Sequence, residues 1–217
     1  MKVMTDMELT APLIAVARHR LAVDGKGVTT LVAFHGCTLH CHYCLNVQCL
    51  RPESVWRNVT PAELLDELMI DNLYFLATGG GVTFGGGEPA IRSEFIEAFC
   101  HIAPPEWHIT LETALNVDRH HLERLLPLIH EYIIDIKDVN PIIYKRYTRQ
   151  DNSLALENLQ WLLSHDGMAD RVVVRVPHIP DFNTDKDILH TRDYITSIGV
   201  TRIDEFTYQR REHPSVD

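Results

Sequence analysis

Four of the five cysteines of this chain lie in one short loop, GCTLHCHYCLNVQC, over residues 36–49. Cys37, Cys41 and Cys44 have the spacing C-x3-C-x2-C. Thiolates are ligands of soft metals, and three of them in one tight loop suit three corners of an iron–sulfur cube. The fourth iron of such a cube lacks a protein ligand and stays open to a small molecule. The loop therefore predicts an iron–sulfur centre with one vacant position.

A zinc site is the alternative for the same cysteines. Structural zinc takes four ligands, and Cys49, His40 or His42 lies near enough in the sequence to supply the fourth. An odd number of cysteines, most of them crowded together, does not resemble the disulfide framework of a secreted domain and favours metal binding in a reducing compartment. The spacing favours the cluster and leaves zinc open. Outside a metal site, Cys49 is an ordinary loop thiol and Cys100 a residue of a helix core.

Strand and helix patterns alternate from about residue 30 onward. Apolar and β-branched runs predict strands at 29–36, 81–87, 107–113, 131–137, 171–177 and 202–208. Amphipathic runs with capping residues predict helices at 60–70, 92–102, 118–130, 152–166 and 185–199. Such alternation forms right-handed βαβ units with a parallel sheet, and six units are too few to close an eight-stranded barrel. We expect an α/β fold, an open and curved partial (β/α)6 TIM-like barrel, with a flat Rossmann-like sheet as the alternative.

Unusual residues stand at the carboxyl ends of all six predicted strands. After the cysteine loop of the first strand they are, in chain order, GGGEP (85–89), Glu112 and Thr113, Asp135 and Lys137, Arg175, and Tyr208 and Gln209. Because the carboxyl ends of parallel strands meet on one face of the fold, these residues predict one site. Asp135 and Lys137 flank a single residue, so both side chains should point to the same face. Arg175 stands in an apolar strand and needs an anionic partner, either a ligand or Glu112 or Asp135.

Composition and charge exclude several classes of function. The chain has 217 residues, 45% of them hydrophobic and 23% charged, as in an ordinary globular protein without a linker, and we expect one domain over residues 1–217. No apolar run approaches the roughly 20 residues of a membrane span, and the N-terminal sequence lacks the apolar core of an export signal, so we expect a cytoplasmic protein. A net charge of −10 without a compensating basic run argues against nucleic acid as a partner.

The motifs together resemble a known family. A C-x3-C-x-aromatic-C loop after the first strand and a GGE(P) turn after the second resemble the radical S-adenosylmethionine (SAM) superfamily. Within it, DGKGVTTLVAFHGCTLHCHYCLN, GGGVTFGGGEPA, YIIDIKD and RVPHIPDFNTD are similar to the glycyl-radical-enzyme activating proteins of the pyruvate formate-lyase activating type. The similarity runs from about Asp24 to Gln209 and marks the core of the expected domain.

This resemblance implies cofactors and the residues that hold them. A [4Fe–4S] cluster would be bound by Cys37, Cys41 and Cys44, and SAM would bind its open iron. One electron would then break a carbon–sulfur bond of SAM and leave a 5′-deoxyadenosyl radical, so no side chain acts as a general acid or base. The implied SAM-binding residues are Tyr43 and Leu45 at the adenine, Gly86, Gly87 and Glu88 at the ammonium, Asp135 at the ribose, Lys137 at the carboxylate, and Arg175 and Gln209 in the pocket. Gln209 stands where the type enzyme has His.

The resemblance also implies a monovalent cation near the SAM carboxylate. Glu112, Thr113 and Asp135 fall on the positions that bind this cation in enzymes of the type, although Glu112 replaces the usual Asp. The longer side chain changes how a cation would be reached there.

The implied function is that of an anaerobic radical SAM oxidoreductase. It would cleave SAM reductively and abstract a hydrogen from a backbone glycine of a large glycyl radical enzyme, with flavodoxin or ferredoxin as electron donor and the chain as a monomer. One alternative keeps the chemistry and changes the substrate to another peptide or a small molecule. The other is a zinc-stabilised or electron-transfer module that is not an enzyme.

Overall fold

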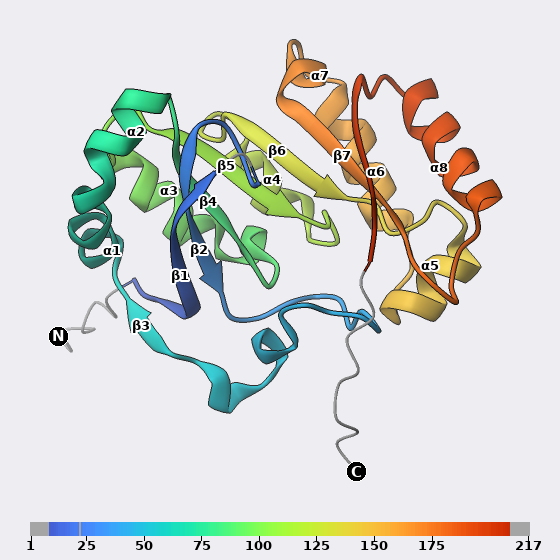
Figure 1. The fold of residues 1–217 in the computed structure, drawn as a ribbon, viewed down its shortest axis with the longest axis horizontal. Helices are drawn as coiled ribbons and strands as arrows, with labels where there is room; N and C mark the ends of the chain where they lie inside the picture. The colour runs from blue at the N-terminus through green and yellow to red at the C-terminus, as the bar shows by residue number, and fades with distance from the viewer. Residues whose placement is uncertain (1–8, 22, 209–217) are drawn as a thin grey trace, which may run out of the picture.

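A single eight-stranded sheet forms the centre of the computed structural model, which describes residues 9–21 and 23–208. Its strands are β1 (Ala11–Leu21), β2 (Val28–Phe34), β3 (Arg57–Val59), β4 (Gly81–Gly86), β5 (His108–Thr113), β6 (Glu131–Asp135), β7 (Val172–His178) and β8 (Arg202–Thr207). They lie in the order β3-β1-β2-β4-β5-β6-β7-β8. β2 and β4 to β8 run parallel, and β1 pairs antiparallel with β2 and β3. The end strands β3 and β8 do not pair with each other, so the curved sheet stays open (Figure 1).

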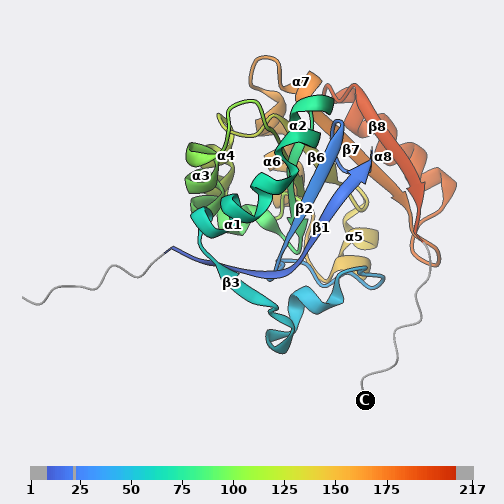
Figure 2. The same cartoon turned by 60° about the vertical axis from the view of Figure 1, so that its left-hand side comes forward.

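The strand order confirms the partial barrel and shows that the Rossmann-like alternative is wrong. A doubly wound sheet reverses its strand order at a switch point. Here the six parallel strands follow one another across the sheet as they do along the chain. Right-handed crossovers that always step in one direction place the helices on one face of the sheet. Figures 1 and 2 show the helices along the outer side of the curved sheet, which leaves its inner face for a site.

Eight helices connect the strands within the described residues. They are α1 (Pro61–Leu68), α2 (Asn72–Thr78), α3 (Ser93–Ile102), α4 (Arg119–Leu125), α5 (Pro141–Thr148), α6 (Ser153–Leu163), α7 (Met168–Arg171) and α8 (Asp185–Ser197). α1 begins at the predicted position because Thr60 and Glu63 form a capping box before Pro61 at the first helical position. α4 ends at Leu125, earlier than predicted and before Pro127, which cannot donate a helical hydrogen bond. In the described residues, no helix has the length and apolar character needed to cross a membrane.

The core lies between the sheet and its outer helices. Phe34 of β2 stacks on Phe84 of β4 with ring centroids 5.6 Å apart, and Phe95 and Phe99 of α3 meet these rings edge to face. All four side chains are buried. Since side chains alternate along a strand, the neighbours of Phe84 in β4 face the opposite, inner side of the sheet. That side carries polar residues from several strands, as described below.

β1 and β3 are two strands that the sequence prediction missed, and Asp71 ties β1 to the rest of the fold. The Asp71 side chain is completely buried in a short 3₁₀ turn (η3, Met69–Asp71) before α2. It accepts hydrogen bonds from Arg18 Nε at 2.8 Å and from Thr30 Oγ1 at 2.9 Å, and His19 Nε2 lies 2.9 Å away. Burial alone would raise the pKa of Asp71, but the hydrogen bonds from Arg18 and Thr30 bring this pKa below its ordinary value.

We expect Asp71→Ala to lower the free energy of unfolding by about 2–3 kcal/mol, because hydrogen bonds to a buried charged group are lost. A carboxylate with a lowered folded-state pKa stabilises the fold above its unfolded pKa of about 4, and this increment is lost as pH falls through the folded value. Asp71→Asn should therefore lose stability at pH 7 and show a smaller further loss in acid than the unchanged chain. Urea unfolding of the unchanged chain, Asp71→Ala and Asp71→Asn, at pH 7 and at a pH below about 4, measures the loss of stability and its pH dependence. Equal unfolding curves for the three proteins would contradict the prediction.

Candidate functional site

A cavity of about 200 Å³ lies at the carboxyl ends of the parallel strands. Thirteen of the residues singled out from the sequence line it, namely Cys37, Cys41, Cys44, Leu45, Gly86, Gly87, Glu88, Glu112, Thr113, Asp135, Lys137, Arg175 and Tyr208. Tyr43 is not among the lining residues, and Gln209 lies outside the described residues. A more open hollow of about 400 Å³ between α8 and β8 contains none of these residues, so size does not identify the site. Chemistry does.

The cysteine loop is fixed by backbone hydrogen bonds to other parts of the fold. The N–H groups of His40 and His42 donate to the carbonyl oxygens of Thr148 and Tyr147, each at 3.0 Å. Both acceptors lie at the end of α5, a helix that the sequence prediction missed. Distant parts of the chain therefore hold the loop in place over the strand ends.

The three thiols need a metal to become ligands. Burial raises the pKa of Cys41 to about 12, so this thiol keeps its proton at neutral pH. A hydrogen bond from Cys49 is the largest cause that lowers the pKa of Cys37. A buried thiol loses its proton readily when a metal ion takes the proton's place. The cysteines thus have the chemistry of metal ligands rather than of nucleophiles.

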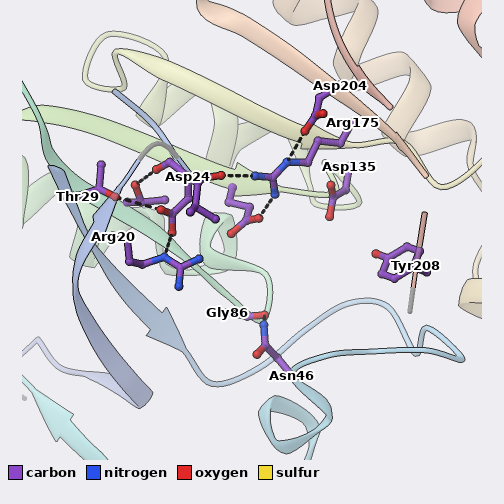
Figure 3. Close-up of polar contacts among 12 residues, drawn as sticks. Arg20, Asp24, Thr29, Asn46, Gly86, Asp135, Arg175, Asp204 and Tyr208 are labelled. Atoms are coloured by element: carbon purple, nitrogen blue, oxygen red, sulfur yellow. Dashed lines mark hydrogen bonds and ion pairs between the residues drawn. The ribbon is translucent and has the colours of Figure 1, made fainter. Parts of the chain in front are cut away.

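The glycine turn after β4 brings bare backbone against the cysteine loop. Gly87 N–H donates to Phe34 O at 3.0 Å, and Glu88 N–H donates to Gly36 O at 2.8 Å. Gly86 has a φ of +92°, a conformation that glycine adopts without strain. Asn46 Nδ2 donates to Gly86 O at 3.0 Å (Figure 3). Backbone hydrogen bonds and the Asn46 side chain thus join two strand ends to the cysteine loop.

The carboxylate of Glu88 connects the end of β4 to the end of β5. It is buried and accepts hydrogen bonds from Thr113 Oγ1 at 2.6 Å, Ala114 N at 2.9 Å and Ala90 N at 3.1 Å. Burial raises the pKa of Glu88, and these three donors oppose the rise. Glu88 therefore braces the wall of the cavity, and its role toward a ligand ammonium stays a prediction.

Asp135 and Lys137 face the same cavity, as their spacing in the strand indicates. Lys137 Nζ donates to Asp135 Oδ2 at 2.9 Å and to Tyr208 Oη at 2.7 Å. Although burial opposes it, the Asp135 carboxylate raises the pKa of Lys137 well above its ordinary value. Asp135 Oδ1 is buried and has no hydrogen-bond partner among the described residues. The pair offers a ligand one fixed positive charge and one available acceptor.

Arg175 pairs with Glu112, one of the two partners that the sequence left open. Its Nη1 forms a short ion pair with Glu112, its Nη2 donates to Val23 O at 3.0 Å, and its Nε lies 3.6 Å from Asp204 Oδ2 (Figure 3). Glu112 therefore already has a partner, and the hydroxyl of Thr113 donates to Glu88. Of the three residues implied for a monovalent cation, Asp135 keeps an unpaired oxygen. The cation stays a prediction, and the ion pair with Arg175 occupies one carboxylate oxygen of Glu112.

Asp24, between β1 and β2, is a further buried acid that the sequence prediction did not single out, and it does not line the cavity. Asp24 accepts hydrogen bonds from Arg20 Nε at 2.5 Å and Thr29 Oγ1 at 3.0 Å, and its carbonyl oxygen accepts from Thr83 (Figure 3). The neighbouring Val23 carbonyl receives the bond from Arg175. The segment between β1 and β2 thus fixes Arg175 through the Val23 carbonyl oxygen.

The two histidines proposed for a zinc site, His40 and His42, do not line the cavity that the three thiols share. Among the described residues, no three His, Cys, Asp or Glu side chains lie close enough to hold a single metal ion. His40 and His42 are exposed, and His42 packs on Tyr43 and Phe182. Cys37, Cys41 and Cys44 instead share the wall of a cavity, an arrangement that fits a cluster larger than one ion.

Tyr43 and several residues missed from the sequence complete the site. The Tyr43 hydroxyl donates to Asp181 at 3.0 Å, and its ring packs against Phe182 rather than lining the cavity. The lining residues that the sequence reasoning did not assign to the site are Leu39, Asn46, Ala114 and Phe206. Asn46 had a usable signal, since it stands two residues after the third cysteine of the loop.

Comparison of this chain with known proteins points to the same family that its motifs resemble. Residues 31–195 match the family model described as the Radical SAM superfamily. The chain is 33% identical over 176 residues to the (2S)-3-sulfopropanediol dehydratase activating enzyme of Klebsiella oxytoca, covering 78% of this chain and 53% of that protein. It is 29% identical over 184 residues to the pyruvate formate-lyase-activating enzyme of Staphylococcus aureus, covering 81% and 72%. The chain therefore spans about half the length of the first relative.

Solved structures share the fold at low sequence identity. The crystal structure of Streptococcus suis SuiB superposes with a TM-score of 0.62 at 11% identity, covering 82% of this chain and 39% of SuiB. SuiB bound to S-adenosylmethionine also has a TM-score of 0.62, at 12% identity, covering 84% and 43%. These likenesses support the architecture of the open barrel, and the chemistry follows from the residues above.

Proposed function

The chain belongs to the radical SAM superfamily, and on that premise we propose that it is an activating enzyme for a glycyl radical enzyme. It would cleave SAM reductively at a [4Fe–4S] cluster and remove a hydrogen atom from a backbone glycine of its protein partner. One observation carries the proposal: three thiols, a bare glycine backbone and an Asp–Lys ion pair line the same cavity. The two curated relatives are activating enzymes by name, which supports the choice of partner class.

The residues of the cavity fit both cofactors. Cys37, Cys41 and Cys44 would hold the cluster, and SAM would bind against Asp135 and the glycine backbone, which line the same cavity. When bound, the cluster and SAM together supply the one-electron chemistry that breaks a carbon–sulfur bond and allows hydrogen abstraction. No side chain of the cavity has to transfer a proton in that reaction.

The work of the chain is to bind, orient and exclude water. Lys137 presents a positive charge suited to a carboxylate, and Tyr208 and Asp135 fix its position. Asp135 Oδ1 can accept a hydrogen bond from a hydroxyl or ammonium group. Leu39 and Phe206 add apolar wall that keeps water from the reacting groups. The cation, if bound, would add to the positive charge that Lys137 provides.

The open sheet supports a macromolecular substrate. β3 and β8 leave a gap in the barrel, and Leu45 combines a place on the cavity with 48% exposure of its surface. A peptide loop with the target glycine could therefore reach the cavity from the side. We further propose that the chain acts as one domain and as a cytoplasmic monomer, and that flavodoxin or ferredoxin supplies the electron.

Anaerobic reconstitution with iron and sulfide tests the proposal. The reconstituted protein, reduced and supplied with SAM, should release 5′-deoxyadenosine and produce the electron paramagnetic resonance (EPR) doublet of a glycyl radical when a pyruvate formate-lyase or a glycyl radical dehydratase is added. Deoxyadenosine without a doublet on either partner would point to a different peptide or small-molecule substrate. A protein that holds zinc and leaves SAM intact would refute the proposal altogether.

A further inference from the structure

The end of α5 carries a group of exposed positive charges beside the cysteine loop. Lys145, Arg146 and Arg149 form this group, which we call the α5 basic patch. Two backbone carbonyl oxygens that lie between them in the sequence accept the N–H groups of the cysteine loop described above. Figures 1 and 2 show α5 beside the loop that follows β2. The patch therefore lies next to the segment that contains Cys41.

The positive charge of this surface is unusual for the chain. The chain has 30 acidic residues among 217 and a net charge of −10, yet residues 35–51 and 139–150 contain no Asp or Glu. The first range holds the cysteine loop, and the second holds α5. Asp151 borders the patch and lies 3.4 Å from Lys145, and both side chains are more than half exposed. The patch is thus a positive region on a protein that is negative as a whole.

The three cations of the patch differ in what they hold. Arg146 Nη2 donates to the carbonyl oxygens of Asp181 and Phe182, at 3.0 and 2.7 Å, and so ties the loop after β7 to α5. The contact of Lys145 with a carboxylate is exposed, and such ion pairs contribute little to stability. Arg149 ends α5 through its backbone N–H, while its side chain is exposed. Lys145 and Arg149 are therefore the residues to change, because replacing Arg146 would also release the loop.

An electron from outside must enter the proposed cluster through the protein surface nearest to it. Cys41 lies between the two loop residues whose N–H groups bind the end of α5, so the patch borders that surface. Two proteins of negative net charge repel each other unless they meet through faces of opposite sign. A positive patch beside the cluster thus favours a donor with an acidic face and steers it to the place where the electron is needed.

We propose that the α5 basic patch docks a small acidic electron-transfer protein that reduces the cluster. The inference rests on the proposed function and deepens it, since it assigns a docking surface and a charge to the electron donor. The donor would lose one electron and the cluster would gain it, with no bond formed or broken and no proton transferred. Lys145 and Arg149 do not line the SAM cavity and act by steering the donor.

Reversal of the charges tests the patch. In the variant with both Lys145→Glu and Arg149→Glu, the second-order rate constant for cluster reduction by a reduced flavodoxin or ferredoxin should fall about tenfold or more at low salt, as loss of electrostatic steering predicts. The difference from the unchanged protein should shrink as salt is added, because the Debye length falls from about 30 Å at 0.01 M to about 8 Å at 0.15 M. Stopped-flow absorbance of the reconstituted proteins measures the rate.

Asp151→Asn gives a change in the opposite direction. It removes the negative charge beside Lys145 and keeps a side chain of the same shape. The rate constant with the protein donor should therefore rise about twofold or more at low salt, since like charges repel and fewer now oppose the donor. Damage to the fold does not produce such a gain, so this variant separates steering from a structural effect.

Two controls isolate the docking step. Lys26→Glu makes the same change of charge at an exposed lysine before β2, which spans seven residues, roughly 23 Å. That distance exceeds the Debye length of about 10 Å at 0.1 M, so the rate should stay near that of the unchanged protein. The neutral small reductant 5-deazariboflavin, reduced by light, should reduce the cluster of every variant at the same rate, because it needs no docking surface.

Several results would overturn the inference. They are an unchanged rate with the protein donor after charge reversal, an equal loss with 5-deazariboflavin, and no reduction of the unchanged protein by either protein donor while 5-deazariboflavin succeeds. Normal reduction of the variant with slower formation of the glycyl radical would assign the patch to the protein substrate and overturn it too. An unchanged protein that takes up no cluster, or leaves SAM intact with every reductant, would instead refute the proposed function.

Discussion

Cys41→Ala is expected to abolish cluster binding and, with it, the cleavage of SAM. The three thiols at the cavity are the proposed donors for three irons, and a cluster held by two side chains would be poorly anchored. Cys41 is the most informative of the three to replace. Cys49, the remaining cysteine of the loop, follows Cys44 by five residues and is better placed to replace Cys44 than to replace Cys41, from which it is eight residues away.

Iron and sulfide content after anaerobic reconstitution measures the first effect, and release of 5′-deoxyadenosine measures the second. Both should drop to the background seen without protein. Cys100→Ala is the matched control, because it removes a part-buried thiol from α3 that does not line the cavity. Full cluster content in Cys41→Ala would show that the metal is held by other residues and would contradict the assignment of the loop.

The parallel part of the fold could be predicted because it follows from local patterns. Each of the six parallel strands is a short β-branched or apolar run, and the helix after Thr60 carries a complete capping signal. The place of the candidate site could be predicted from the same strand pattern, because polar and charged residues at the carboxyl ends of parallel strands converge on one face of an α/β fold. Asp135 and Lys137 face one cavity because side chains alternate with a period of two along a strand.

β1, β3 and α2 could not be read from the same signals. The pairing of β1 with β2 shifts register twice, and His19 within β1 has a positive φ, so its side chains do not alternate regularly. β3 has three residues, too few for a period. α2 exposes apolar side chains such as Leu73, which is 78% exposed, and so lacks the polar face that marks a surface helix.

Side-chain partners across the fold depend on contacts that no local pattern encodes. Tyr43 stands between two ligand cysteines, yet Asp181 and Phe182, from a distant loop, direct its ring away from the cavity lining. Arg175 of β7 pairs with Glu112 of β5 across the intervening strand β6. Both side chains lie on the inner face of the sheet. The sequence limits such partners to a few acids, and the three-dimensional register selects among them.

The second large effect is expected from Gly87→Ala, which should displace the cysteine loop. A Cβ at Gly87 would lie 2.0 Å from Gly36 O and 3.1 Å from Phe34 O. These are backbone atoms on the strand that leads into the loop, and both already hold hydrogen bonds across the turn. They cannot rotate away as a side chain would. The added methyl group must push Gly36, and with it the neighbouring Cys37, away from the cavity.

We expect Gly87→Ala to lower the free energy of unfolding by about 1–3 kcal/mol, as overpacking does. The rate of SAM cleavage should fall about a hundredfold, since a shift of about 1 Å in a reacting group can have that effect. Deoxyadenosine release, cluster content and urea unfolding give the three readouts. Gly199→Ala is the control, because a Cβ there meets open space. Its φ of +104° makes alanine strained, so this variant reports the general effect of such a change away from the site.

Comparing deoxyadenosine release, cluster content and stability shows whether Gly87 serves the contact with the cysteine loop or the approach of a ligand. If the glycine serves the contact with the loop, the variant should lose cluster content and stability together, because Gly36 and Cys37 move as one segment of backbone. If it serves close approach of a ligand, the cluster should assemble normally and the KM for SAM alone should rise. The 2.0 Å separation from Gly36 O favours the first result. Normal cluster content, stability and kinetics in Gly87→Ala would show that the turn and the loop are not in contact as the structure has them.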